Sequence, residues 1–331
     1  MTSTIFGNAI VIVSNLGKIK NLQKKIITTT SIKTTNTTTT TRMMMSTTTL
    51  REPVYFQGDG TPLNKQTFMA KLESMLLLKP KNVLFVGENH SDPSAHGLEL
   101  ELLQKAAALR PGETALSLEF FDRSAQPLLD EYLLNFIDYE TFIDHIEAPG
   151  NHRDYRPLID FCKLKGLPVI AANCSRRHSR LMSRQGSDAM EKLAEESEIH
   201  RNFLLPPLPI QPASQQYEAN FRETMGIVGS SELDDQKITR MLGAQSLWDA
   251  TMAHSITKAL YRSNLVVHVA GYFHVKQNLG IPEHLAHYCT DIDYGQTTIV
   301  MLPEEDLVFS EQEHTNASDL VILTDINAID L

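Results

Sequence analysis

Two glutamates and two histidines of this 331-residue chain have the types and positions needed for acid–base or metal chemistry. They are Glu88, His90, Glu119 and His274, and each ends or closely follows a short apolar run. Such runs are typical of strands buried on both faces of a parallel sheet. Because functional groups collect at the carboxyl ends of parallel strands, we expect all four side chains to share one rim of a sheet.

This group of side chains has three interpretations. Imidazole and carboxylate groups are ligands for Zn, Mn or Fe, so the group could form a divalent metal site. It could instead form a metal-free site in which a histidine activates water and a glutamate orients it. The third interpretation is a satisfied polar cluster at the sheet edge. Four strand endings of this kind favour a functional site, but the residues alone leave its chemistry open.

The spacing within two of these strand endings supports a shared geometry. Glu88 and His90 are two positions apart, which places them on the same side of an extended segment. Gly87 and Gly271 each stand three residues before a histidine, at the end of a predicted strand. Glycine allows the chain to turn sharply off the strand and present the imidazole. A repeated Gly-x-x-His turn therefore predicts that His90 and His274 are displayed in similar ways.

Further polar and aromatic side chains near the predicted rim are expected to bind a ligand. Arg123 and Asn173 follow the second and third predicted strands. Arg176 opens a helix after the third strand, and both a helix N-terminus and a guanidinium group favour a carboxylate or phosphate. Trp248 and Asp249 lie on a long predicted helix, where polar groups on a packed face indicate the pocket.

The elements that must position these residues alternate between strands and helices. This alternation predicts an α/β fold with a mainly parallel sheet, right-handed crossovers and helices on both faces. The long excursion before the fourth strand, about 187–261, is expected to form a helical cap. The predicted strands cover residues 82–87, 114–119, 167–172, 265–270 and 297–302, and the main predicted helices cover 65–78, 92–110, 124–134 and 157–165.

The chain divides into four parts by composition. Residues 1–51 are rich in threonine, contain seven basic residues and lack acidic ones, which is typical of an organellar transit peptide for a mitochondrion or plastid. The alternative is a disordered leader that carries no targeting signal. Residues 52–80 are expected to be a linker with a lead-in helix, 81–303 the α/β domain, and 304–331 a tail that ends as a last strand or loosely.

Charge and hydropathy exclude several functions. All 40 acidic residues follow position 51, so the folded part carries a formal charge near −17 although the whole chain carries −10. An acidic body argues against nucleic-acid binding, which needs clustered Lys and Arg. The apolar stretch 9–16 is shorter than the roughly 20 residues that span a bilayer, so we expect a soluble protein. Three widely spaced cysteines argue against a disulfide framework.

These motifs together resemble the ChaN-like family, the haem-binding-uptake branch of the Tiki/erythromycin-esterase superfamily. The resemblance covers residues 80–302, and its motifs occur in the family's order. The matching stretches are Val86–Asp92, Ser117–Arg123 with Gln126, Leu167–Asn173, Ala244–Ala253, and Ala270–His274 with Gly280–Pro282.

The resemblance implies two different activities. The resemblance to bacterial ChaN, a haem-binding lipoprotein that pairs through stacked haems with the iron held by a tyrosine, implies two properties. They are a haem or related tetrapyrrole cofactor and a homodimer. No single position matches that tyrosine, and Tyr155 and Tyr272, each beside a candidate site residue, are the two candidates for it. Tiki-type relatives are metal-dependent proteases, and His90, Glu119 and His274 match their pattern of divalent metal ligands. Esterase relatives use Glu and His to activate water.

Three hypotheses follow from these observations. In the first, the chain is a haem- or iron-tetrapyrrole-binding protein, and this is the leading expectation. In the second, it is a metal-dependent or His/Glu-assisted hydrolase of an ester or amide, with Glu88 or Glu119 as the base. In the third, it is a scaffold that has kept the rim without its chemistry. In the first two, the partner is a small molecule, either a tetrapyrrole or an ester or amide substrate.

Overall fold

The computed structural model describes residues 50–146, 148–227 and 232–329, so the predicted leader lies outside the described residues except for its last two positions. One sheet organises this part of the chain, with strand order β2-β1-β8-β7-β3-β6-β4-β5. Strands β3 to β8 pair in parallel, and β1 pairs antiparallel with β2 and β8. The strands are β1 (Val54–Gln57), β2 (Pro62–Leu63), β3 (Lys81–Glu88), β4 (Thr114–Asp122), β5 (Val169–Asn173), β6 (Leu265–Gly271), β7 (Tyr294–Glu304) and β8 (Leu320–Asp325).

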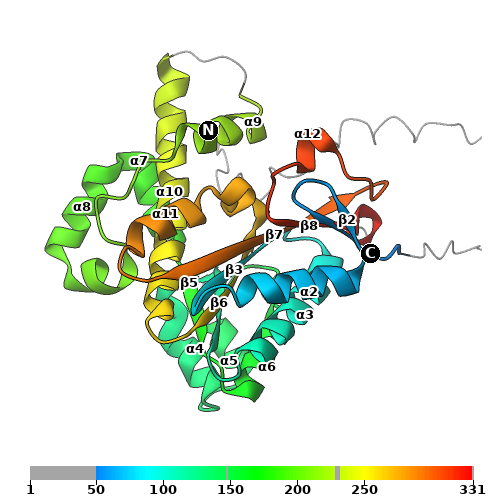
Figure 1. Cartoon of the computed structure of the whole chain (residues 1–331). Helices are drawn as coiled ribbons and strands as arrows, with labels where there is room; N and C mark the ends of the chain where they lie inside the picture. Colours follow the sequence, from blue (N-terminus) through cyan, green and yellow to red (C-terminus); the bar gives the residue numbers. More distant parts are fainter. Residues whose placement is uncertain (1–49, 147, 228–231, 330–331) are drawn as a thin grey trace, which may run out of the picture.

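Helices cover both faces of this sheet (Figure 1), which confirms the predicted α/β class. Along β3, Leu84 and Val86 face one apolar core, whereas Val83 and Phe85 face the other. Both sides of the strand are therefore apolar, as expected for a buried parallel strand. The first face carries α2 (Lys65–Leu76), α3 (Pro93–Leu109), α4 (Gln126–Leu133), α5 (Tyr139–Asp144) and α6 (Arg156–Lys165), and the second carries α10 (Glu232–Leu260) and α11 (Ile281–Tyr288).

The excursion between β5 and β6 is helical, as predicted, but it does not act only as a cap. Its elements are α7 (Arg176–Gln185), α8 (Ser187–Glu196), the π-helical turn η2 (His200–Leu204), α9 (Gln215–Thr224) and α10. Figure 1 shows α7 and α8 beside α10 at one end of the molecule. They share a small apolar core of their own with α10. The last part of α10, with Met252, Ile256 and Leu260, instead packs on the sheet.

The sheet extends beyond the predicted domain 81–303 in both directions. The segment expected as a linker supplies β1 and β2, and the expected tail supplies α12 (Glu311–His314) and β8. Strand β8 is buried along its whole length between β1 and β7. Of the two expected endings of the tail, the structure therefore contains the strand. None of the described helices is long and apolar enough to cross a bilayer.

Asp92 connects this last strand to the start of α3. Its carboxylate is fully buried and caps α3 by accepting a hydrogen bond from the Ser94 N–H at 2.9 Å. The other oxygen accepts a hydrogen bond from the Thr324 hydroxyl of β8. Asp92 therefore fixes α3 to the edge of the sheet where Glu88 lies.

We expect Asp92→Ala to lower the free energy of unfolding by about 2–3 kcal/mol, since it removes a cap and leaves a buried hydroxyl without its partner. Urea unfolding measures the change. Asp138→Ala is the matched control, because Asp138 caps α5 from an exposed position and makes no second hydrogen bond of this kind within the described residues. Equal losses in both variants would contradict the role given to Asp92.

Candidate functional site

Four neighbouring strands bring the predicted residues to one edge of the sheet. Strands β3, β6, β4 and β5 are adjacent in this order, and Glu88 pairs in register with Gly271. The pairing of β4 with β5 is irregular between Leu118 and Asp122. Irregularities of this kind commonly redirect a side chain beside an active site. Glu119 lies within it, and its Oε2 accepts a hydrogen bond from the Gly271 N–H at 2.7 Å.

Glu88 and His90 form a hydrogen-bonded pair at the end of β3. Glu88 Oε1 lies 2.6 Å from His90 Nδ1 and also accepts a hydrogen bond from the Tyr155 hydroxyl at 2.7 Å. Because an ionised carboxylate only accepts hydrogen bonds, the proton of this pair is on Nδ1. In the neutral ring, Nε2 is then free to accept a proton. The Glu88 side chain is fully buried, whereas that of His90 is 32 % exposed, so a ligand can reach the imidazole.

The charges around this pair set its protonation. Burial alone would raise the pKa of Glu88, but hydrogen bonds to its carboxylate, foremost from His90, hold the pKa below its ordinary value. Burial alone would lower the pKa of His90, but the hydrogen bond to Glu88 and the negative charge of Glu119 outweigh it and raise this pKa. The two carboxylates therefore stabilise the protonated form of His90.

A second histidine lies between two carboxylates. His274 Nδ1 bonds Asp249 on α10, and His274 Nε2 lies 3.4 Å from Glu119 Oε1. The Gln245 side-chain amide also contacts both ring nitrogens, and the two carboxylates on either side of the ring favour its doubly protonated form, the imidazolium. Burial opposes this charge, but Glu119 and Asp249 outweigh burial and raise the pKa of His274 well above its ordinary value. The same contact lowers the pKa of Glu119.

The glycines of the two Gly-x-x-His turns serve close packing instead of the sharp turn expected from the sequence. Neither Gly87 nor Gly271 has a positive φ. A Cβ on Gly87 would lie 2.9 Å from the Cα of Tyr272, and a Cβ on Gly271 would lie 3.0 Å from His90 Nε2. The same Gly271 position is 3.7 Å from Glu119 Oε2. The absent side chain of Gly271 therefore leaves room for the His90 ring beside Glu119.

The family of the chain follows from its sequence. The family described as "Haem-binding uptake, Tiki superfamily, ChaN" matches residues 75–285, which is more than half of the chain. The chain belongs to this family. The predicted resemblance is thereby confirmed, and four of its motifs contribute Glu88, Glu119, Asp249 and His274 to the rim.

Comparison with solved structures agrees with the ChaN fold. ChaN of Campylobacter jejuni, described by its cofacial haem binding, is 13 % identical and superposes with a TM-score of 0.58 over 82 % of this chain and 97 % of that one. A mutant of the erythromycin esterase EreC in its open conformation is 12 % identical over 80 % of each chain, with a TM-score of 0.41. At 13 % identity the likeness to ChaN shows the fold alone. No curated protein matches the chain.

In this ChaN family member, the structure brings together six of the predicted site residues and places Trp248 close by. Tyr155 stacks on Phe120 with ring centroids 3.4 Å apart, which holds its hydroxyl on Glu88. The Trp248 ring lies 6.4 Å from the His274 ring. The six residues are Glu88, His90, Glu119, Tyr155, Asp249 and His274.

The other predicted ligand-binding residues have different surroundings. Arg123 is buried and uses its guanidinium group to bind the carbonyls of Leu205 and Thr251 and the hydroxyl of Ser255, so it fastens the excursion to β4. Arg176 is exposed at the start of α7, and the Asn173 side chain accepts a hydrogen bond from the next backbone N–H. Tyr272 is half-buried against the core of the second sheet face.

The predicted metal ligands of the ChaN rim are not arranged as one ion site. In the described part of the chain, His90, Glu119 and His274 do not form a group whose ligand atoms all lie within 4.8 Å of one another. Both nitrogens of His274 are also directed at carboxylates. This arrangement does not fit a single ion bound by all three residues.

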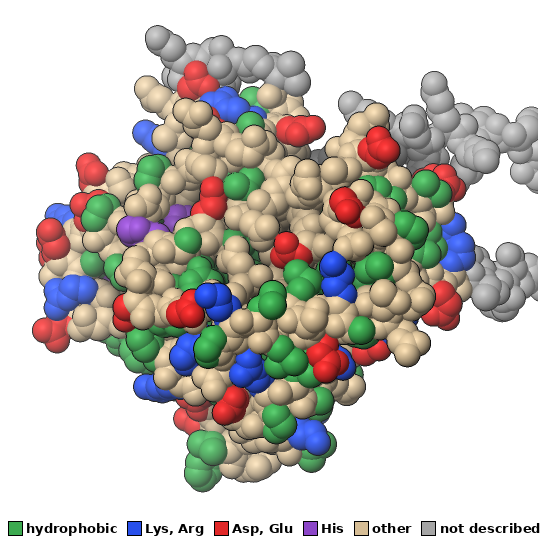
Figure 2. Space-filling model, viewed as in Figure 1, with side chains coloured by type: hydrophobic (Ala, Val, Ile, Leu, Met, Phe, Trp, Pro, Cys, Tyr) green, Lys and Arg blue, Asp and Glu red, His purple; other side chains and the backbone are tan. Residues whose placement is uncertain are grey.

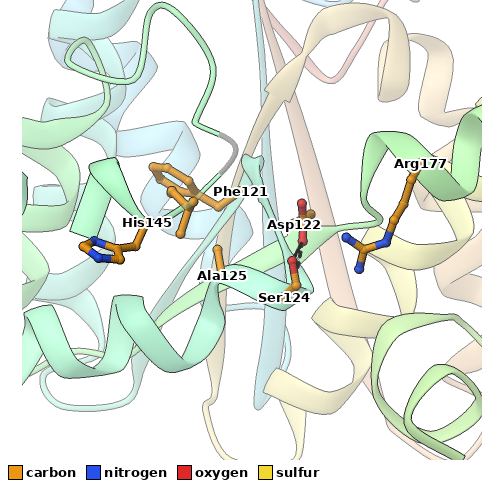
Figure 3. Close-up of a pocket in the computed structure, with 7 residues that line it drawn as sticks. Phe121, Asp122, Ser124, Ala125, His145 and Arg177 are labelled. Atoms are coloured by element: carbon orange, nitrogen blue, oxygen red, sulfur yellow. Dashed lines mark hydrogen bonds between the residues drawn. The ribbon is translucent and has the colours of Figure 1, made fainter. Parts of the chain in front are cut away.

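A pocket of about 200 Å³ lies farther along β4. Figure 3 shows Asp122 bonded to Ser124 in this pocket, with Arg177 on one side and His145 and Phe121 on the other. Its volume is below the roughly 300–1,000 Å³ of a typical ligand pocket. None of the residues of the rim lines it.

Figure 2 shows acidic and basic side chains interspersed on the viewed face.

The Asp249–His274–Glu119 cluster makes stability depend on pH. The raised pKa of His274 stabilises the fold fully below its ordinary value of 6.5, and this stabilisation is lost as pH rises through the folded-state pKa. The lowered pKa of Glu119 stabilises the fold above its ordinary 4.5, and this is lost as pH falls. We expect the melting temperature, followed by circular dichroism, to be highest between these limits. A melting temperature that keeps rising above the pKa of His274 would contradict the cluster.

Proposed function

We propose that the rim is a hydrolytic site in which His90 is the general base. The observation that carries this proposal is the 2.6 Å contact between His90 Nδ1 and the buried Glu88, which leaves Nε2 of a partly exposed ring without a hydrogen-bond partner among the described residues. Nε2 would take a proton from water while the water oxygen attacks the carbonyl carbon of an ester or amide, and it would return this proton to the leaving alcohol or amine as the acyl C–O or C–N bond breaks. Glu88 orients the ring and stabilises the imidazolium that forms.

The second histidine has a positioning role in this proposal. His274 is an imidazolium with both N–H groups directed at carboxylates, so it is not a base. It holds Glu119 beside Gly271, where the carboxylate charge raises the pKa of His90. The base is therefore assisted by two carboxylates, Glu88 through a hydrogen bond and Glu119 through its charge.

Hydrolysis of a panel of activated esters and chromogenic amides by the purified chain tests the proposal. We expect kcat/KM to increase with pH through the raised pKa of His90, because the base must be neutral to accept a proton. No turnover of any ester or amide, or a rate that falls as His90 is deprotonated, would contradict it.

Iron-tetrapyrrole binding is the second candidate function, and the family match supports it. Tyr155 has its hydroxyl buried on Glu88 and does not fit the role of an iron ligand. Tyr272 fits better, because it is half-buried beside the rim and its hydroxyl has no hydrogen bond within the described residues. A tyrosinate is an established haem ligand, and it would hold the iron, whose redox chemistry the bound haem would supply.

Titration with haemin separates this candidate from the first. Binding predicts a shifted Soret band that is lost in Tyr272→Phe and kept in Tyr155→Phe, and pairing through stacked haems predicts a dimer in gel filtration only when haemin is present. A spectrum identical to that of free haemin would exclude it.

The basic, acid-free residues 1–51 support a site of action in a mitochondrion or plastid.

A further inference from the structure

Behind the Glu88–His90 pair lies a second group of ligating side chains. Glu88 ends β3, whereas His96 and Glu99 are one turn apart on α3 and so lie on the same side of that helix. Each of the three offers a ligand atom, and these atoms all lie within 4.8 Å of one another. Neither His96 nor Glu99 is among the site residues predicted from the sequence.

The polar atoms of this group are buried without hydrogen-bond partners. Both carboxylate oxygens of Glu99, Glu88 Oε2 and His96 Nε2 lack a partner among the described residues, and Glu99 is fully buried. His96 Nε2 does lie 3.3 Å from Glu88 Oε2, but the two groups are not aligned as a hydrogen bond. Buried carboxylates without partners are costly, and buried charges are normally paired or bound to a metal.

We propose that Glu88, His96 and Glu99 bind a divalent transition-metal ion such as Mn²⁺, Fe²⁺ or Zn²⁺. Two carboxylates and one imidazole are the donors that these ions accept, and two negative charges balance the ion. The 3.3 Å between His96 Nε2 and Glu88 Oε2 is close to the roughly 3.4 Å edge of a tetrahedron with metal–ligand bonds of about 2.1 Å.

The ion connects to the rim through a single carboxylate. Glu88 Oε1 is occupied by His90 and Tyr155, so Oε2 is the oxygen that faces His96 and the proposed ion. Glu88 would therefore bridge the ion and the imidazole of His90, and the ion would fix the carboxylate that orients this ring. The site does not depend on the hydrolytic proposal, because its measurement needs no substrate.

A protonated Glu99 is the competing explanation for the same geometry. Burial, followed by the charges of Glu88 and Asp92, raises the pKa of Glu99 well above its ordinary value. A neutral carboxylic acid would have no affinity for an ion at neutral pH, whereas a metal ligand would lose its proton on binding. Metal binding at neutral pH, with release of a proton, separates the two explanations.

The experiment uses the full chain, stripped with a chelator and titrated with Mn²⁺ or Zn²⁺ by calorimetry, with the bound metal measured by elemental analysis. We expect one ion per chain and a higher melting temperature with metal than without it. Glu99→Gln and His96→Asn should lose binding by more than the roughly 10–100-fold that loss of an outer-shell partner costs.

Two controls accompany the metal titration: a variant of the other group of possible ligands, and a test that the Glu99 variant is folded. Glu313→Gln is the matched control, because Glu304, Glu313 and His314 form the other group of possible ligands in the described chain, and this variant should keep the ion. Metal-free Glu99→Gln should melt above the metal-free wild-type chain, since it removes a buried carboxylate, which shows that the variant is folded. A wild-type chain that binds no ion, or variants of Glu99 and His96 that bind it equally well, would overturn the proposal.

Discussion

Replacing His90 with alanine is expected to lower kcat for ester or amide hydrolysis by about 10³-fold, within the range that a positioned general base contributes. The reason is that Nε2 of His90 is the free acceptor at the rim, with Nδ1 bound to Glu88. The loss should appear in kcat and in kcat/KM, because the proton moves in the transition state. Steady-state kinetics on the substrate found in the ester and amide panel measures it.

Two variants make this first prediction specific. Glu88→Gln keeps the shape of the side chain but removes the charge that stabilises the imidazolium, so its kcat should also fall. His287→Ala, at an exposed position of α11, is the matched control and should retain wild-type kinetics. Because His90 is the foremost hydrogen-bond partner of the buried Glu88, its truncation should also lower the melting temperature, and the kinetics are measured well below the melting temperature of the variant. An active His90→Ala variant would remove the histidine from the mechanism.

The second large effect concerns stability. We expect His274→Asn to lower the free energy of unfolding at pH 7 by about 3–5 kcal/mol, as for other buried charge pairs from which one partner is removed. The variant leaves the fully buried Asp249 and the largely buried Glu119 without their cationic partner. Urea unfolding followed by tryptophan fluorescence measures the change, since Trp248 lies beside His274.

Unfolding measured at acidic pH provides the internal control for this variant. At a pH below the ordinary 4.5 of a glutamate, Glu119 can be protonated in the variant, so the difference from the wild-type chain should shrink. The double variant Glu119→Gln/His274→Asn should be more stable than His274→Asn alone at pH 7. A pH-independent loss would mean that His274 contributes through packing only.

The sequence was sufficient to predict which strand ends meet. Glu88, Glu119 and His274 end or follow apolar runs, and the parallel-sheet rule then places them on one edge without any knowledge of strand order. Strand β8 was harder, because its short run follows a long acidic stretch and only pairing with β7 distinguishes a strand from a loose end. Strand β1 has four residues and gave no signal above its turn-rich surroundings.

The contacts of individual side chains could not be predicted, because they depend on how each helix is rotated against the sheet. Arg123 follows a strand just as the site residues do, yet it binds carbonyls of the excursion. Glu99 offered a signal that was missed. It is a charged residue in the apolar stripe of α3 between Leu98 and Leu102, which predicts a buried carboxylate in need of a partner.

The titration of His90, followed by nuclear magnetic resonance of its labelled imidazole nitrogens, tests the account most directly. We predict that the neutral ring carries its proton on Nδ1 and leaves Nε2 bare, and that Glu88→Gln lowers the pKa of His90 because a stabilising negative charge is removed. A neutral ring protonated on Nε2, or a His90 pKa that does not respond to Glu88→Gln, would contradict a base oriented by a buried carboxylate.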